Sequence, residues 1–91
     1  MLETDLSVDN VRHVETRLAE VVVLNRRAAN LRAMRKCRGM TTVEMGRRCG
    51  VLPNFLVEME NGQRSISIRT IDRVARGLGV ASSVVLAELD R

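Results

Sequence analysis

The 91-residue sequence predicts an all-α protein, and three observations support that fold class. The composition is aliphatic, with one Phe, no Trp and no Tyr, so a core of Val, Leu, Ala and Met is expected. Apolar residues recur at steps of three and four along most of the chain, which is the period of an amphipathic helix. The single Pro and most of the Gly lie between Gly39 and Gly62, so most turns are expected there.

The first predicted helix begins after Ser7, a good N-cap residue, and no Gly or Pro interrupts the sequence up to Arg38. One long helix and two abutting helices are both compatible with this stretch. The β-branched run from Val21 to Val23, followed by Asn25, is the weakest point and the favoured place for a break, with a short strand as the second reading. The apolar stripe of this first region consists of Val8, Val11, Val14, Leu18, Val21 and Val22.

Two short helices are expected in the middle of the chain. A second apolar stripe starts at Leu31 and ends at Gly39, where glycine favours a helix stop. Thr41 or Thr42 can cap the next helix, which is expected to end at Gly50.

After that turn, Pro53 suits the first position of a helix, because its missing N–H would be unpaired there in any case. Leu56 and Met59 lie three residues apart and are expected to point inward. Asn61-Gly62 is expected to end this helix.

Two further helices complete the predicted fold. Ser67 can cap a fourth helix that is closed by Gly77 and Gly79, and Ser82 or Ser83 can start a fifth. The expected buried face of the fourth helix is Ile68, Ile71, Val74, Ala75 and Leu78. The fifth helix carries Val85, Leu86 and Leu89.

The segment LRAMRKCRGMTTVEMGRRCGVLPNFLVEMENGQRSISIRTIDRVARGLGVASSVVL, residues 31–86, contains a spaced set of residues typical of one family. The set comprises Leu31, Arg35, Gly39, the threonines that follow it, Gly50-Val51, Leu56, Met59, Glu60-Asn61-Gly62, Ser67, Ile68, Ile71, Ala75, Leu78, Gly79 and Val80. On these residues the segment resembles the Cro/C1-type (XRE) helix-turn-helix domain.

The resemblance implies a five-helix, lambda-repressor-like domain, which we assign to residues 26–91, with residues 1–25 as an N-terminal helical extension. It also implies that Arg35 and Glu60 form an ion pair that ties the first helix to the end of the third. The extension lies outside the resemblance. Its stripe is expected to pack over the domain, because so small a domain needs more buried area, and the seam of a homodimer is the alternative.

In DNA-reading relatives, the first turn of the third helix presents polar side chains to the major groove. The matching residues here are Leu52, Pro53, Asn54, Phe55, Val57 and Glu58. Only Asn54 is a good direct reader, of adenine, while Glu58 could accept from a cytosine amine but would lie close to phosphates of its own sign. The apolar members are expected wholly or partly on the surface, where such clusters commonly anchor protein interfaces.

Three interpretations of this helix remain open. Phe55 could fold back into the core, or Phe55 and Leu52 could touch thymine methyls in a dimeric operator-binding repressor, with Asn54 reading adenine. The third interpretation is a docking site for a protein, such as a transcription activator held inactive by contact, as in antiactivator members of the family, or an antitoxin-like modulation. The missing hydrogen-bonding readers favour the protein partner.

If DNA is bound, the resemblance implies phosphate contacts at Thr42, which replaces a frequent Gln, and at the turn formed by Asn61, Gly62 and Arg64. The net charge of +4 suits phosphates and acidic protein partners equally well.

The composition also argues against other classes of protein. Two Cys twelve residues apart and the lone His13 do not form a metal site, so no metal and no cofactor are expected. The scattered acids do not suggest a catalytic constellation, so an enzyme is not expected. No signal peptide or membrane-spanning run is recognised, and a reducing cytoplasm is the expected location.

Overall fold

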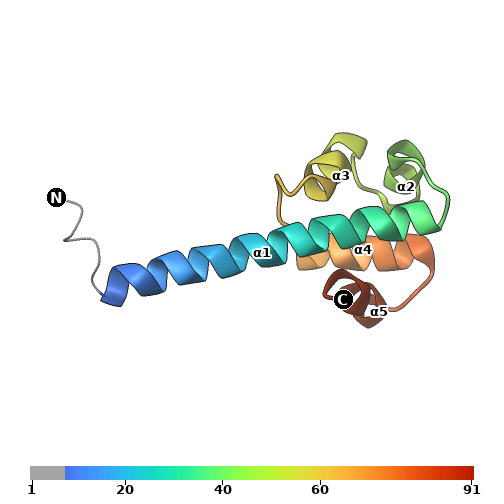
Figure 1. Cartoon of the computed structure of the whole chain (residues 1–91). Coiled ribbons are helices and arrows are strands. Elements are labelled where there is room, and N and C mark those ends of the chain that lie inside the picture. The colour runs from blue at the N-terminus through green and yellow to red at the C-terminus, as the bar shows by residue number, and fades with distance from the viewer. Residues whose placement is uncertain (1–7) are drawn as a thin grey trace.

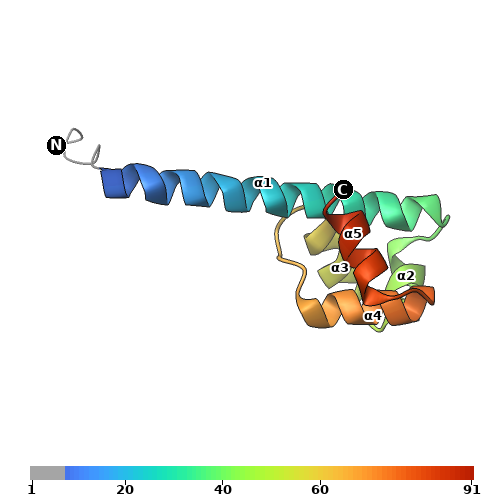
Figure 2. The same ribbon diagram turned by 90° about the horizontal axis from the view of Figure 1, so that it is seen from below.

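The structure, a computed structural model, describes the chain from residue 8 to residue 91, and its side chains from residue 13 onward. The helices are α1 (Val8–Cys37), α2 (Thr42–Cys49), α3 (Pro53–Glu60), α4 (Ile68–Leu78) and α5 (Ser82–Leu89). Helices α2 and α3 lie to one side of α1 (Figure 1). Helix α4 lies across the domain from α1, with the other three helices between them (Figure 2). No strand occurs in the described range, so the all-α class and the five-helix count of the domain are confirmed.

Helix α1 is continuous through the valine run, so the favoured break between Val21 and Asn25 is wrong and the single long helix is correct. β-branched residues reduce helix propensity by less than about 1 kcal/mol each, and the surrounding Leu, Ala, Glu and Arg residues compensate for that loss. The cap predicted at Ser7 lies outside the described residues.

The N-terminal half of α1 does not pack over the domain, which corrects the expected arrangement. It projects beyond the other helices (Figures 1 and 2), and Val14, Leu18 and Val21 are each at least half exposed. The reason is the length of α1: every described residue from 13 to 23 is exposed, whichever way it points from the helix, and the first buried residue is Ala28. The stripe lies on the part of α1 that extends past the shorter helices, so folding the chain does not cover it.

The core lies between the C-terminal half of α1 and the four shorter helices. Leu56 and Met59 of α3 are buried as predicted. On α4 the prediction is only partly correct, because Ile68 is 78% exposed while Ile66, in the preceding loop, is buried. Ile68 is the first residue of α4 and lies beyond the edge of the core. The buried cluster consists of Leu31, Met34, Met45, Cys49, Val51, Leu56, Met59, Ile66, Ile71, Val74, Ala75, Val85 and Leu89.

Side-chain caps begin α2 and α4, whereas Leu52 and Ala81, the N-cap residues of α3 and α5, make no side-chain cap bond. Thr41 is the N-cap of α2, and its hydroxyl accepts a hydrogen bond from the Glu44 N–H at 3.1 Å. Ser67 caps α4 in the same way. Ser82 is the first residue of α5, and its hydroxyl donates to the Asp72 carboxylate at 2.7 Å, which links α5 to α4.

Two ion pairs fasten α1 to the rest of the domain. Arg35 donates to both carboxylate oxygens of Glu60, at 2.8 and 2.9 Å, so the pair implied by the resemblance is present. Arg27 donates to Asp90, just after α5, at 2.7 Å, and this bond lowers the pKa of the Asp90 carboxyl. The first pair is buried, with the two side chains 13% and 5% exposed, whereas the second is open to solvent.

Candidate interaction surface around helix α3

Helices α2 and α3 are joined by a tight turn. Gly50 adopts a left-handed conformation with φ 69°, and the Val51 N–H donates to the Gly46 carbonyl at 2.9 Å. Leu52 stands at the N-cap of α3 and makes no side-chain cap bond, while Pro53 opens the helix as predicted. The first turn of α3 therefore carries an apolar residue where a hydroxyl would usually bind the backbone.

The residues predicted on the outer face of α3 lie there. Leu52 is 58% exposed, Val57 is 40% exposed, and Asn54 is also exposed. Phe55 is exposed too, at 37%, so its ring is not part of the core. Pro53 and Glu58 are half-buried beside them.

Arg64 covers part of this face from the turn after α3. Its guanidinium carbon lies 4.4 Å from the centre of the Phe55 ring, within the range of a cation–π contact. The same guanidinium donates to the Glu58 carboxylate at 2.7 Å. Glu58 therefore already has a basic partner, and Arg64 is held against α3 on two sides.

The residues expected to contact DNA phosphates, if DNA is bound, either make hydrogen bonds within the domain or lie beside a carboxylate. The N–H groups of Asn61 and Gly62 donate to the Val57 and Met59 carbonyls at 3.0 and 3.2 Å, so neither is unpaired. Thr42 is half-buried in the first turn of α2. That turn also carries a carboxylate, Glu44, which would lie close to a phosphate bound there.

Sequence reasoning missed a group of four arginines near the α3 face. Arg47 and Arg48 end α2, and Arg73 and Arg76 lie on α4. All four line one hollow of about 480 Å³ between the C-terminal parts of these two helices. The spacing of each pair was visible in the sequence, but only the packing of α2 on α4 brings the pairs together.

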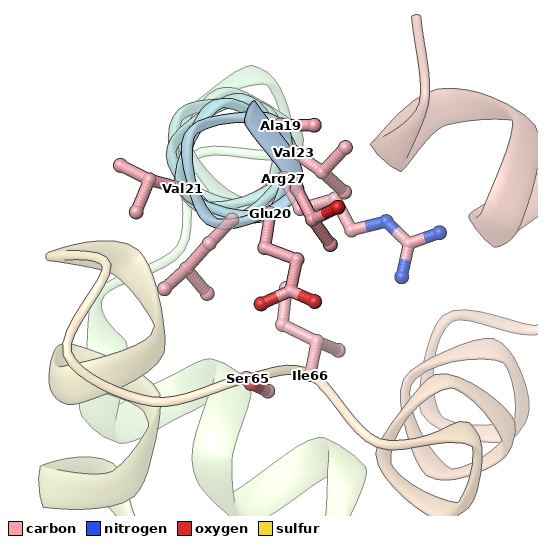
Figure 3. A pocket seen from close by; sticks show the side chains of 9 residues that line it. Ala19, Glu20, Val21, Val23, Arg27, Ser65 and Ile66 are labelled. Atoms are coloured by element: carbon pink, nitrogen blue, oxygen red, sulfur yellow. The ribbon is translucent and has the colours of Figure 1, made fainter. Parts of the chain in front are cut away.

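Another hollow, of about 580 Å³, lies between α1 and the loop that precedes α4. Figure 3 shows Glu20 pointing from α1 toward this loop at Ser65 and Ile66, with Val21 and Val23 on either side of it. The lining is largely apolar, and Glu20 is the only acidic residue among its described members, which therefore offer no pair of catalytic groups.

The remaining chemistry of the described residues is sparse. Cys37 is exposed, Cys49 is buried, and both are free thiols. Burial raises the pKa of Cys49. Among the described residues there is no group of three or more potential ligands that could hold a metal ion, and none of the helices has the length and apolar content needed to cross a membrane.

Comparison with known proteins agrees with this architecture. The sequence model of the helix-turn-helix domain family matches residues 28–89, and the chain belongs to that family. Its fold and family define it as a small transcriptional regulator of the XRE-like helix-turn-helix class.

Two solved structures of a particular regulator are similar to this chain. Both are crystal structures of the clp gene regulator ClgR from Corynebacterium glutamicum, each 30% identical, with a TM-score of 0.63. Each alignment covers 74% of this chain, and 71% and 87% of the respective ClgR chains. No curated protein sequence matches closely enough to be significant.

Proposed function

We propose that this regulator acts by protein–protein contact through the outer face of α3, as an antiactivator or antitoxin-like modulator of a transcription factor. One observation carries the proposal: Leu52, Phe55 and Val57 are all substantially exposed on the helix that would enter the major groove. Protein interfaces are anchored by apolar and aromatic side chains, whereas base edges are read by hydrogen bonds.

The surroundings of α3 also support a protein partner. Two acidic residues, Glu44 and Glu58, lie on the first turn of α2 and on α3, where a DNA backbone would pass. Arg64, the basic residue of the turn after α3, is engaged with Glu58. A duplex would have to break this pair or accept a carboxylate near its phosphates.

The second candidate is a dimeric operator-binding repressor. Asn54 is exposed and of the right chemistry to read adenine, and the chain has a net charge of +4. The uncovered stripe of Val14, Leu18 and Val21 on α1 is suited to pairing with a second copy.

A pair of substitutions distinguishes the two candidates. The transcripts that change when the gene is deleted are measured first. The deletion strain is then complemented with the gene for Phe55→Ala, for Asn54→Ala or for Ile68→Ala. Ile68→Ala is the control, because it removes an exposed apolar side chain away from α3. Loss of regulation with Phe55→Ala and its retention with Asn54→Ala are expected for a protein-docking face. The opposite pattern would favour direct base reading.

A titration with duplex DNA of random sequence, followed by NMR, tests the same question in vitro. Backbone-driven binding falls roughly 10³–10⁵-fold between 50 and 200 mM salt when several phosphates are contacted. We expect only weak binding, absent at physiological salt. Tight, salt-sensitive binding centred on Asn54, Asn61 and Arg64 would overturn the proposal.

A further inference from the structure

We infer that the α3 surface takes an acidic amphipathic segment of the partner protein. Apolar side chains of this segment would lie against Leu52 and Phe55, and its carboxylates would bind arginines of α2 and α4. The inference rests on the proposed function and deepens it by stating the chemistry of the partner.

The apolar part of this surface is a groove between α3 and α4. It has a volume of about 280 Å³, and its walls include Leu52 and Phe55, with Val51 and Met59 of the core behind them. Two arginines, Arg64 and Arg73, belong to the same lining. A groove of this size accepts a few apolar side chains and leaves their neighbours near the basic groups.

Two further hollows adjoin this groove. The hollow between α2 and α3, of about 360 Å³, is lined by Leu52 and Pro53 together with Arg47. The hollow between α2 and α4 shares Arg47 with it and shares Arg73 with the α3–α4 groove. The three therefore form one surface, with an apolar centre at Leu52 and Phe55 and a basic border.

Among the described residues, no acidic residue lines any of these three hollows. Of the arginines that line them, Arg64 is paired with Glu58, and the charge of the other four is unbalanced within the described part of the chain. Arg47 and Arg76 make no hydrogen bond or ion pair with the described residues. Arg48 and Arg73 each donate to one backbone carbonyl, at 2.8 and 3.4 Å, and keep their other N–H groups available. Arginine binds carboxylates with two parallel hydrogen bonds, which gives both strength and orientation.

The close packing of α2 and α4 explains how the arginines come together. A Cβ at Gly77 would lie 2.7 Å from the Arg48 carbonyl and 2.7 Å from the Cys49 sulfur. Only a glycine lets α4 approach α2 this closely. The contact brings Arg76 of α4 beside the end of α2.

The position of the arginines favours a protein over a nucleic acid. In DNA-reading relatives, phosphates are met near the first turn of α2 and at the turn after α3, where this chain carries Glu44 and the Glu58–Arg64 pair. The unbalanced positive charge lies instead beside the C-terminal parts of α2 and α4, next to an apolar groove. An apolar centre with a basic border is complementary to a segment that alternates apolar and acidic residues.

The test is a selection of random peptides of about 16 residues, long enough for four helical turns, displayed on phage and captured by the immobilised full chain. We expect the enriched peptides to combine Asp or Glu with Leu, Ile, Phe or Trp. A synthetic peptide of the enriched sequence should lose affinity by roughly tenfold or more with Phe55→Ala, with Arg73→Glu and with Arg76→Glu. Arg76→Glu removes no hydrogen bond of the fold, and Arg32→Glu, an exposed arginine of α1, is the matched control that should bind normally.

The outcomes separate this inference from the proposed function. If the enriched peptides are neutral or basic but bind the Phe55→Ala variant poorly, the inference of an acidic partner is refuted. The proposal that a protein docks at α3 then still stands. Peptides that bind equally well to Phe55→Ala, together with duplex DNA binding that Arg73→Glu abolishes, would refute both.

Discussion

Replacing Arg35 by Met should destabilise the protein by about 3–5 kcal/mol, because it leaves a buried carboxylate without its partner. The Arg35 side chain makes three hydrogen bonds: Nε and Nη2 donate to Glu60 at 2.8 and 2.9 Å, and Nη1 donates to the Met40 carbonyl at 2.8 Å. Glu60 is 5% exposed, so water cannot replace these donors without local opening. Two charge-assisted bonds at about 1.5–3 kcal/mol each sum to about 3–6 kcal/mol, which overlaps this range.

The assay is urea unfolding followed by circular dichroism, which yields the free energy of unfolding and its slope with denaturant. The matched variant is the double substitution Arg35→Met with Glu60→Leu. It should recover most of the loss, because no buried charge then remains. A loss below about 1 kcal/mol for Arg35→Met, or a double variant as unstable as the sum of the single variants, would refute the reasoning.

Three further predictions concern the thiols, the turn after α3 and the projecting helix. Iodoacetamide should modify Cys37 alone in the folded protein and both thiols in urea, because burial covers Cys49 and raises its pKa. Mass spectrometry counts the adducts, and two adducts on the folded protein would contradict this prediction. Gly62→Ala should cost about 1–3 kcal/mol in urea unfolding, because φ is +74° and the new Cβ would lie 2.9 Å from Asn25 Oδ1; unchanged stability would contradict the strain. If the chain is a dimer through α1, Leu18→Glu should give a monomer in sedimentation equilibrium with an unchanged helix content, and a wild-type monomer at high concentration would rule that seam out.

Much of the fold could be predicted because it depends on local signals. Ser67 caps α4 and Pro53 opens α3, as their chemistry requires. The break at the valine run was wrong because propensity differences of a few tenths of a kcal/mol per residue cannot by themselves end a helix.

The candidate site was predictable only in part. The exposure of Leu52 and Val57 followed from the helical period, since Leu56 and Met59 must face the core. The contact of the Arg64 guanidinium with the Phe55 ring, by contrast, comes from the turn after α3, and a period within α3 contains no information about it.

The sequence by itself determined that this chain forms a five-helix helix-turn-helix domain and that Asn54 is the one good direct base reader among the outer residues of its third helix. Both properties depend on residue type at fixed local spacing. Tertiary structure alone decided that the stripe of α1 stays uncovered and that Arg47, Arg73 and Arg76 border the apolar groove. The period of apolar residues predicts which way a side chain points from its own helix. The neighbour that covers this side chain depends on how helices far apart in the sequence pack together.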